Sequence, residues 1–536
     1  VEMAKEGIIS KERAVELVDP YQLYQLLLPS FDPKAKKEAH KIAQGLNASP
    51  GAAIGKIVFD TDEAATRGEA GEKVILVRIE TCPDDIHGMI ASQGVLTLRG
   101  GMTSHAAVVA KGMGKPCVSG CEDLKIDLAN KTLTAADGTI YHENDVISID
   151  GGTGEVMAGA VQTQSATMDE NFETLFKWVD EFKKLTVRAN ADTPLDVQNA
   201  LKLGAEGVGL CRTEHMFMDP SRLPWVQKMI IAGTKEARKE ALAKLLPMQY
   251  QDFKDMFKAL NGYPMTIRLL DPPLHEFLPD KETLIAEVAT LKAKGEDYKE
   301  KENLLHTVEE LSESNPMMGL RGCRLGLMFP EINEMQVRAI FEAACDLKKE
   351  GLTVKPEIMI PLISHVNELR IDRALLEEVA KEVMQEKGVE IEYMFGTMIE
   401  IPRAALTADE VAQYAEFFSF GTNDLTQMTF GYSRDDAEGK FLSKYVEDKI
   451  LPANPFETLD TKGVGQLMQI ALEKALPVRP NLKRGICGEH GGDPNSVKFC
   501  HKIGLNYVSC SPFRVPQARL AAAQAAIADK KAKALV

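Results

Sequence analysis

Residues 394–424 read MFGTMIEIPRAALTADEVAQYAEFFSFGTND, and this stretch decides the fold class. A short apolar run ends at Glu400, where the Ile-Pro that follows suits the first turn of a helix. After that helical segment a second apolar run, Phe417–Thr422, leads into Asn423 and Asp424. Short apolar strands that alternate with helices predict a parallel sheet built from strand–helix units. Both strands of this stretch run into a carboxylate or amide side chain.

The same alternation runs from residue 185 to residue 536. The candidate strands in it are Leu185–Asn190, Gly207–Arg212, Met265–Leu270, Glu357–Leu362, Met394–Glu400, Phe417–Thr422, Arg484–Glu489 and Tyr507–Ser511. Eight strand–helix units in about 350 residues are the pattern of an α/β protein with a (β/α)8 TIM barrel. A charged helical insertion over residues 281–316 makes this barrel slightly large. A doubly wound sheet is the alternative, although such sheets usually have fewer strands.

The sequence before the barrel divides into three segments that differ in their residue pattern. Residues 49–160 consist of short β-like runs bounded by Gly, Asp or Asn, which predicts one compact mixed domain. Residues 161–184 end in the apolar period of a linking helix, and residues 1–48 predict a helical connector broken by a proline-containing turn. Because position 1 is valine and the helical pattern starts at once, we expect a fragment that lacks an N-terminal part of its protein.

Charge and composition exclude several classes of protein. Among 536 residues, 63 Lys and Arg stand against 79 Asp and Glu, and the net charge of −16 argues against nucleic acid as a partner. No run approaches the roughly 18 to 20 apolar residues of a membrane helix, and the start lacks the apolar region of a signal peptide. The nine cysteines are scattered, as reduced thiols are. We therefore expect a cytoplasmic protein without nucleic-acid or membrane partners.

A barrel places its functional groups at the C-terminal ends of its strands. Arg212 and Arg268 stand near two such ends, and arginine can clamp a carboxylate or phosphate through bidentate hydrogen bonds. Glu400 and Asp424 supply oxygen ligands of the kind that Mg²⁺ prefers. The alternative is that these two carboxylates cap the helices that follow them. Together, the four side chains predict a site for a small oxyacid and a divalent cation.

Two further residues carry candidate chemistry. Cys487 lies at the end of the seventh predicted strand, where its thiol can act as a general acid toward an enolate carbon. The alternative is that Cys487 is a small buried side chain without a chemical role. His105 follows Gly100–Ser104 and opens an apolar helical run, so a phosphoryl group on its imidazole would lie at a helix N-terminus. The alternative there is a helix capped by Thr103 or Ser104 beside an incidental histidine.

The run Gly100–Ala110 is similar to the phosphohistidine signature of the phosphoenolpyruvate-utilising enzymes. Its Gly-Met-Thr-Ser-His form resembles the pyruvate, phosphate dikinases of that family, because the phosphoenolpyruvate synthases and enzyme I of the sugar phosphotransferase system usually have arginine where Met102 stands. The likeness covers residues 49–536 and includes Gly207–Glu214, Thr266–Asp271, Asn315–Gly322, Gly396–Pro402, Ser419–Leu425 and Gly485–Asp493.

The resemblance implies an activity for each domain. Residues 49–160 would be a swivelling domain with His105 as phosphoryl carrier, and the barrel would run pyruvate + phospho-His105 ⇌ phosphoenolpyruvate + His105. This is one half of the conversion of ATP, phosphate and pyruvate into AMP, diphosphate and phosphoenolpyruvate. In the barrel the resemblance implies that Arg212, Arg268 and Arg321 bind the oxyanions and that Glu400 and Asp424 ligate Mg²⁺. It further implies that Gly421, Thr422 and Asn423 line the substrate and that Cys487 transfers the proton at C3.

The resemblance also implies partners. A homodimer belongs to the family pattern, as do ATP and phosphate bound through an N-terminal domain, for which residues 1–48 are too short. Thr103 matches a threonine that a regulatory kinase/phosphatase modifies, and its alternative role is that of a turn hydroxyl. Plastids and glycosomes stay open as compartments beside the cytoplasm. Other readings are a phosphoenolpyruvate synthase, an enzyme I, a Mg²⁺-dependent pyruvate-enolate lyase and a binding module without catalysis.

Overall fold

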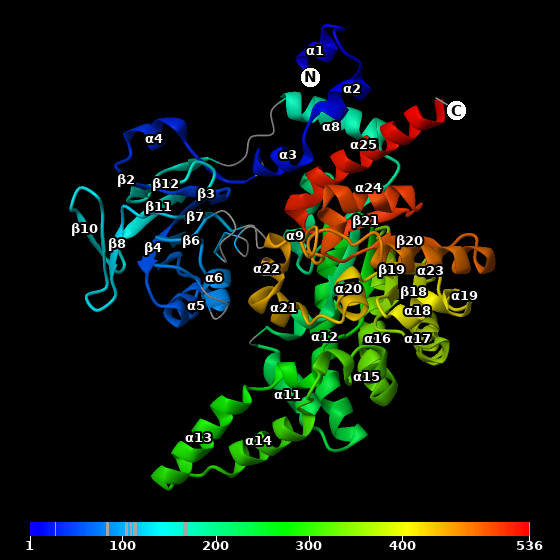
Figure 1. Cartoon of the computed structure of the whole chain (residues 1–536). Helices are drawn as coiled ribbons and strands as arrows, with labels where there is room; N and C mark the ends of the chain where they lie inside the picture. The colour runs from blue at the N-terminus through cyan, green and yellow to red at the C-terminus, as the bar shows by residue number, and fades with distance from the viewer. Residues whose placement is uncertain are drawn as a thin grey trace. The chain divides into compact units, whose positions relative to one another are not determined.

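The computed structural model of the chain describes residues 1–26, 28–81, 85–101, 106, 107, 110, 115–164, 170–219 and 221–534. The chain forms two compact units, one of residues 1–178 with 432–457 and the other of residues 179–431 with 458–536. Each unit has a sheet and an apolar core of its own (Figure 1). No helix within these ranges is long and apolar enough to cross a membrane.

The second unit is built on a closed barrel of eight parallel strands. The strands follow one another around the barrel in sequence order as β14 (Thr186–Asn190), β15 (Val208–Arg212), β16 (Pro264–Arg268), β17 (Lys355–Ile360), β18 (Met394–Ile399), β19 (Phe417–Phe420), β20 (Lys483–Ile486) and β21 (Tyr507–Cys510). Thr186 pairs with Tyr507 and so closes the sheet. The predicted TIM barrel is therefore confirmed, every predicted strand overlaps an observed one, and the doubly wound alternative is wrong.

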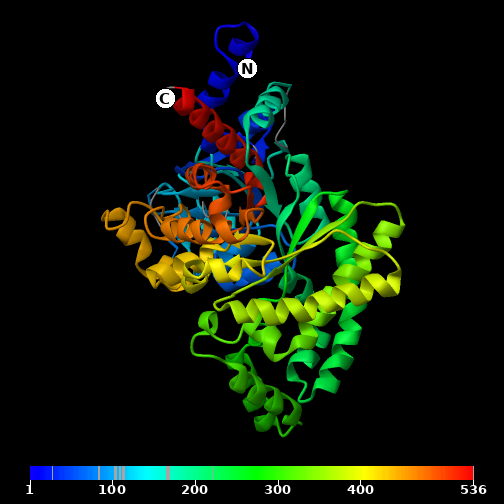
Figure 2. The ribbon, with the colours of Figure 1, turned by 90° about the vertical axis from the view of Figure 1, so that its right-hand side faces the viewer.

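Helices surround this barrel (Figure 2) and pack apolar side chains against its core. In α16 (Pro330–Lys349), for example, Val337, Phe341 and Ala344 recur at helical spacing on the buried face. The other covering helices are α9 (Pro194–Lys202), α10 (Thr213–Phe217), α11 (Leu223–Ile231), α12 (Lys235–Leu260), α15 (Cys323–Met328), α17 (Val366–Lys387), α18 (Pro402–Leu406), α19 (Ala408–Val411), α20 (Thr422–Phe430), α23 (Val464–Val478), α24 (Pro494–Lys502) and α25 (Val515–Ala534).

The predicted insertion before the fourth strand is present as a helical hairpin. Its helices, α13 (Lys281–Lys294) and α14 (Lys299–Leu311), extend away from the barrel (Figure 1). Asp280 caps the first helix, and Gly295 ends it with a φ of +72°. Ion pairs such as that of Lys292 with Glu302 at 2.6 Å join the two helices across the hairpin.

The first unit contains a mixed sheet in the order β2-β12-β11-β4-β5-β6-β7-β3. Its strands are β2 (Lys41–Gln44), β3 (Leu46–Ser49), β4 (Ala52–Val58), β5 (Val74–Arg78), β6 (Gly94–Thr97), β7 (Cys117–Ser119), β11 (Val146–Asp150) and β12 (Glu155–Ala158). The consecutive strands β4 to β7 run parallel to one another. Parallel strands end at one edge of a sheet, which makes that edge a common place for ligand sites.

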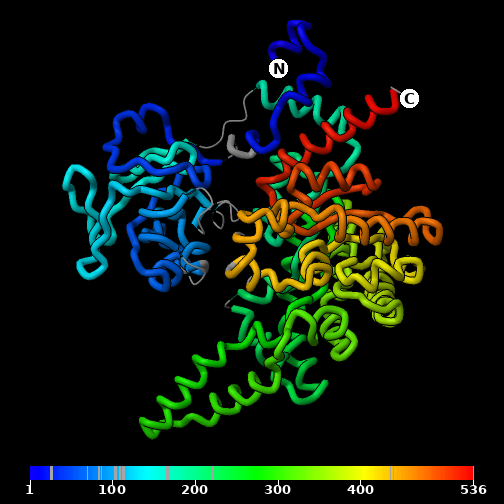
Figure 3. Tube along the Cα trace, viewed as in Figure 1, coloured from blue at the N-terminus to red at the C-terminus, as the bar shows by residue number. Residues whose placement is uncertain are grey.

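Smaller elements complete the first unit (Figure 3). A second sheet consists of β8 (Lys125–Asp127), β9 (Thr132–Thr134) and β10 (Ile140–His142), and β1 (Ser30–Phe31) pairs with β13 (Thr163–Gln164). The helices are α1 (Glu2–Lys5), α2 (Lys11–Leu17), α3 (Pro20–Leu26), α4 (Pro33–Glu38), α5 (Thr61–Glu69) and α6 (Ile86–Ala91).

The sheet of the first unit begins before residue 49, where the sequence predicted the domain to start. β2 and β3 belong to this sheet and pair with β12 and β7. Each has only four residues, and neither shows an alternation of buried and exposed side chains. The period of two that marks a strand in a sequence is therefore absent, so the pattern predicts neither strand.

Residues 432–457 also differ from the expected single barrel domain 185–536, because they belong to the first compact unit. They form α21 (Arg434–Lys440) and α22 (Leu442–Glu447) around an apolar cluster of their own, with Ala437, Leu442 and Phe456 at its centre. The predicted linking helix is present as α8 (Glu170–Phe182), which spans the boundary between the two units.

Candidate active site

The C-terminal ends of the barrel strands bring the predicted side chains together. Arg212 ends β15, Arg268 ends β16, Glu400 follows β18 and Cys487 follows β20. Asp424 lies in the first turn of α20, shortly after β19. Because the strands of a barrel end at one rim, residues that are far apart in the sequence meet there.

Glu400 is a buried carboxylate that faces other carboxylates. The residue is 1% exposed, and its Oε1 accepts the backbone N–H of Leu362 at 2.7 Å. Burial raises the pKa of Glu400 well above its usual range, and Asp424 and Asp271 raise this pKa further. It does not cap the next helix, because α18 begins after Ile401 without a side-chain cap. The anion of Glu400 therefore needs positive charge beside it.

Two arginines connect the carboxylates of the rim. Arg321 Nη2 donates to Asp271 Oδ2 at 2.9 Å and to Asp424 Oδ2 at 3.1 Å. Arg268 pairs with Asp271 at 2.9 Å and with Glu214. Burial raises the pKa of Asp271, but Arg268 and Arg321 outweigh this effect and the net shift is downward. Asp271 thus stays ionised and fixes both guanidinium groups.

Arg212 is held by a residue that the sequence did not single out. Its backbone N–H donates to Asp192 Oδ1 at 2.7 Å, and its Nε and Nη2 donate to Asp192 Oδ2 at 3.0 and 2.7 Å. His215 Nδ1 lies 2.8 Å from the same oxygen. Asp192 and Asp271 were both missed as site residues, although each follows the end of a predicted strand, which was the available signal.

Gly421 brings the backbone close to Glu400. A Cβ at this position would lie 2.8 Å from Glu400 Oε2 and 2.6 Å from Met398 Sδ, so a larger residue would displace one of them. Gly421 is also the residue before α20, which follows the C-terminal end of β19. Free N–H groups at a helix N-terminus favour an anionic ligand.

Thr422 and Asn423 make contacts with the loop after β20. Thr422 Oγ1 lies 2.7 Å from His490 Nδ1, and Asn423 Oδ1 accepts the backbone N–H of Glu489 at 3.1 Å. These bonds tie the start of α20 to the segment that follows Cys487. The predicted lining residues and the predicted proton donor therefore belong to one connected part of the rim.

Cys487 lies between the charged rim and the apolar interior of the barrel. It is 3% exposed and packs in a cluster with Leu210, Met359, Met398 and Phe417. Burial raises the pKa of its thiol from the ordinary 9.0 to about 12. A thiol in this state keeps its proton at neutral pH, as a general acid must.

Among the rim residues described above, carboxylates outnumber guanidinium groups. Three guanidinium groups face five carboxylates, which belong to Arg212, Arg268 and Arg321 and to Asp192, Glu214, Asp271, Glu400 and Asp424. A divalent cation would balance this set. Within the part of the chain that is described, no three His, Cys, Asp or Glu side chains converge to hold a metal. Such a cation would therefore also need oxygens from substrate or water.

The predicted phosphohistidine His105 and the predicted regulatory residue Thr103 lie outside the described residues. The residues that flank them are described. Thr97 ends β6, Gly100 has a φ of +113°, and Ala106 and Ala107 are buried in the core of the first unit.

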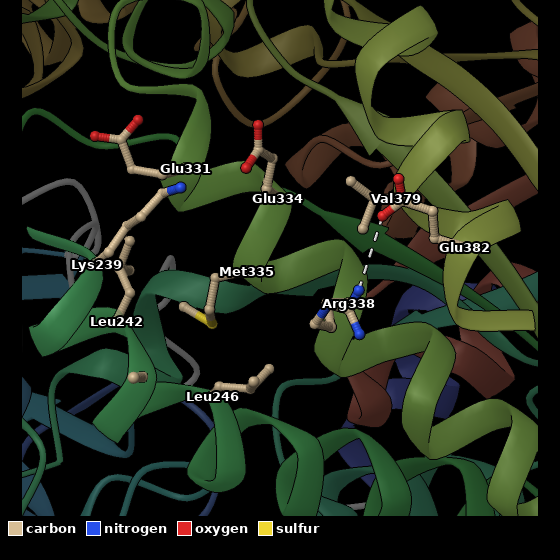
Figure 4. A pocket seen from close by; sticks show the side chains of 10 residues that line it. Lys239, Leu242, Leu246, Glu331, Glu334, Met335, Arg338, Val379 and Glu382 are labelled. Carbon is tan, nitrogen blue, oxygen red and sulfur yellow. Dashed lines mark ion pairs between the residues drawn. The ribbon is translucent and has the colours of Figure 1, made fainter. Parts of the chain in front are cut away.

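A hollow of about 300 Å³ lies elsewhere, among α12, α16 and α17 on the outside of the barrel (Figure 4). Leu242, Met335 and Val379 line it, and Arg338 at its edge pairs with Glu386 at 2.8 Å. It contains none of the predicted site residues. The predicted site residues of the barrel lie at the strand ends and not in this hollow.

A TIM barrel whose rim gathers arginines and carboxylates is suited to small oxyacids. Two family models match the chain, namely the PEP-binding domain of PEP-utilising enzymes over residues 166–527 and the mobile domain of PEP-utilising enzymes over residues 70–154. The chain belongs to the PEP-utilising enzyme family, as the resemblance indicated.

The individual relatives are pyruvate, phosphate dikinases. The chain is 56% identical over 530 residues to that of Clostridium symbiosum, with 99% of this chain and 60% of the relative covered. It is 54% identical to that of Rhizobium meliloti (98% and 58% covered) and 54% identical to the chloroplastic dikinase 1 of Arabidopsis thaliana (98% and 54% covered). The chain thus spans 54 to 60% of the length of these relatives. A solved citrate lyase of Burkholderia xenovorans, at 16% identity, a TM-score of 0.24 and 35% and 53% coverage, is too dissimilar to bear on the reaction.

Proposed function

We propose that the chain transfers a phosphoryl group reversibly between phosphoenolpyruvate and His105, and that pyruvate is formed and consumed at the barrel rim. The observation that carries the proposal is the ion-paired chain in which Arg321 joins Asp271 to Asp424 beside the buried Glu400. This arrangement offers a guanidinium group to an oxyanion, and its carboxylates offer negative charge to a cation. A phosphorylated oxyacid together with a divalent cation satisfies both features.

In the direction that loads the histidine, the bond between phosphorus and the enol oxygen breaks and a bond between phosphorus and a His105 nitrogen forms. The enolate left behind takes a proton at C3 from the Cys487 thiol, which gives pyruvate and a thiolate that recovers its proton from water. Arg212, Arg268 and Arg321 would hold the phosphoryl and carboxylate oxygens. In the reverse direction the Cys487 thiolate removes the proton from pyruvate.

Mg²⁺ is the cation that we propose for the rim. Glu400 and Asp424 would hold it, and it would supply a Lewis acid that stabilises charge on the enolate oxygen. The residues fit this ion, because the pKa of Glu400 is raised by burial and by Asp424, so an ionised pair there requires a positive partner. Gly421, Thr422 and Asn423 would line the bound oxyacid.

The activity of the whole protein is also a proposal. The relatives are named pyruvate, phosphate dikinase, and the corresponding reaction converts ATP, phosphate and pyruvate into AMP, diphosphate and phosphoenolpyruvate. ATP and phosphate would act through sequence beyond this chain. A homodimer and control by a kinase/phosphatase at Thr103 are further proposals that rest on the family likeness alone.

The test is to incubate the chain with Mg²⁺ and phosphoenolpyruvate and to measure pyruvate release and phosphorylation of His105 by intact mass and peptide mapping. We expect one acid-labile phosphate on His105, lost in His105→Ala and reduced at least about a hundredfold in rate in Cys487→Ala. Cys500→Ala is the matched control, because Cys500 is equally buried but lies on α24. Wild-type protein that binds Mg²⁺ and oxalate yet never labels His105 would contradict the proposal.

A further inference from the structure

The inward and outward faces of the barrel strands belong to two different apolar clusters. On β18, Phe395 and Ile399 pack in the main core, which also contains Phe341 of the covering helix α16. Met394 and Met398 of the same strand pack in a second, smaller cluster. Because successive side chains of a strand point to opposite faces, this second cluster fills the inside of the barrel. We call it the inner cluster.

Two members of the inner cluster lie directly below charged residues of the rim. Met398 is two positions before Glu400 on the chain and so points to the same face, and Leu210 stands in the same relation to Arg212. A Cβ on Gly421 would lie 2.6 Å from Met398 Sδ and 2.8 Å from Glu400 Oε2, so both side chains approach the same point of the backbone. Leu210 and Met398 therefore form an apolar layer beneath the charged rim, which we call the apolar floor.

The thiol of Cys487 lies beside the apolar floor. Cys487 shares the inner cluster with Leu210 and Met398, and all three side chains are buried. The Cys487 N–H and its thiol both contact the Phe420 carbonyl oxygen, at 3.2 and 3.8 Å, which holds the side chain in place. A carbon atom that takes a proton from this thiol must touch it and then also lies against the floor. Because protein interiors are close-packed, a further carbon there would have to displace a side chain of the floor.

We infer that the apolar floor restricts the site to oxyacids whose C3 carries no further carbon, namely pyruvate and its enol phosphate. The inference rests on the proposed function, because that function puts C3 beside the Cys487 thiol. The arginines and the cation of the rim would hold only oxygens, and these are the same in every homologous 2-oxo acid. Discrimination between the homologues therefore falls to Leu210 and Met398. One extra methyl group in an apolar pocket is worth about tenfold to about two-hundredfold in rate.

The experiment compares two phosphoryl donors on the full chain with Mg²⁺. One is phosphoenolpyruvate and the other is the enol phosphate of 2-oxobutyrate, which has one more methyl group at C3. The same phosphorus–oxygen bond breaks in both, C3 takes a proton, and the products are pyruvate and 2-oxobutyrate. Phosphorylation of the chain is followed by intact mass at early times. Wild type should prefer phosphoenolpyruvate by about tenfold to about two-hundredfold, and Met398→Ala should lower this preference by about tenfold.

The control variants separate the floor from general packing. Met394→Ala should keep the wild-type preference, because Met394 is the same residue on the same strand and face but four positions, or about 13 Å, further from the rim. Met398→Leu nearly conserves the volume and should keep most of the preference. Leu210→Val removes one methylene group from the floor and should relax the preference by a smaller factor, which keeps the test open if Met398→Ala does not fold. Oxalate has no methyl group, so its Mg²⁺-dependent affinity reports whether the charged rim of each variant is intact.

The outcomes separate the two proposals. Wild type that is phosphorylated by neither donor would overturn the proposed function together with this inference. Wild type that is phosphorylated by both donors at equal rates would overturn this inference alone, as would a wild-type preference in folded Met398→Ala and Leu210→Val. An equal loss of preference in Met394→Ala would assign the discrimination to the packing of the whole barrel, and the floor would not be its source.

Discussion

Asp372 gives a quantitative test of the electrostatics inside the barrel unit. It lies on α17 and is 1% exposed, and the Nδ2 of Asn333 donates to its Oδ2 at 3.4 Å. Its Oδ1 has no hydrogen-bond partner in the described part of the chain. Burial therefore raises the pKa of Asp372 from 3.8 to about 7. This is a carboxyl group that the folded protein holds in its neutral form.

The sign of the effect follows from where the proton is kept. The unfolded chain releases this proton near pH 3.8, whereas the folded protein keeps it up to about pH 7. The contribution of Asp372 to the free energy of unfolding is therefore complete below the pKa of the unfolded chain, and it is lost as the pH rises to the pKa of the folded protein. At 1.36 kcal/mol for each pKa unit, the decline amounts to about 4 kcal/mol in total and to about 2 to 3 kcal/mol between about pH 5 and about pH 8.

Asp372→Asn removes the titration and keeps the shape of the side chain. The variant should gain on wild type by about 2 to 3 kcal/mol as the pH rises from about 5 to about 8. Urea unfolding followed by circular dichroism at each pH measures the difference. Asp346→Asn is the control: burial opposes ionisation of Asp346, but bonds from Lys387 and Tyr250 lower its pKa below 3.8, so this variant should be less stable than wild type by the same amount at about pH 5 and at about pH 8. A stability difference between Asp372→Asn and wild type that is equal at both pH values would refute the reasoning.

Three further changes test the site and its support. Gly421→Ala places a Cβ 2.8 Å from Glu400 Oε2 and 2.6 Å from Met398 Sδ, so it should weaken Mg²⁺-dependent oxalate binding by about tenfold or more and cost about 1 to 3 kcal/mol of stability; calorimetry measures both, and normal affinity would contradict the close approach. Asp192→Asn replaces one of the two oxygens that accept the Arg212 bonds with an amide NH2 and removes the negative charge, so it should raise KM for phosphoenolpyruvate more than it lowers kcat, whereas a pure loss of kcat would speak against positioning. Arg188→Met leaves the buried Glu357 without its 2.8 Å partner and should cost about 3 kcal/mol in urea unfolding, and an unaltered midpoint would show that the pair is dispensable.

The barrel was predictable because its strands are buried on both faces. Runs such as Phe417–Phe420 are buried throughout, with Ser419 as their polar residue, and are bounded by helices, which is the pattern of a parallel sheet covered on both faces. The rim was predictable for a related reason: a polar residue after such a run has few places to lie except the strand end. Glu400 and Arg268 were found in this way.

What the sequence could not supply are contacts made in three dimensions. Whether Glu400 caps a helix or faces Asp424 depends on Leu362, which adopts a φ of +63° and donates its N–H to the carboxylate. The pairing of Asp192 with Arg212 likewise joins the ends of two different strands. The raised pKa of Cys487 comes from its burial among residues of several strands, which composition does not reveal.

The path of the chain through Gly45 has a consequence for self-association. β2 and β3 are separated by this one residue, yet they form the two opposite edges of the sheet, and the Gly45 N–H donates to the Gly154 carbonyl at 2.8 Å. A single nine-residue segment, 41–49, thus supplies both edge strands and covers β12 and β7, and a newly uncovered strand is a template for pairing with other molecules. A chain begun at residue 50 would uncover β12 and β7 at once and is expected to aggregate, whereas one begun at residue 40 keeps both of them paired.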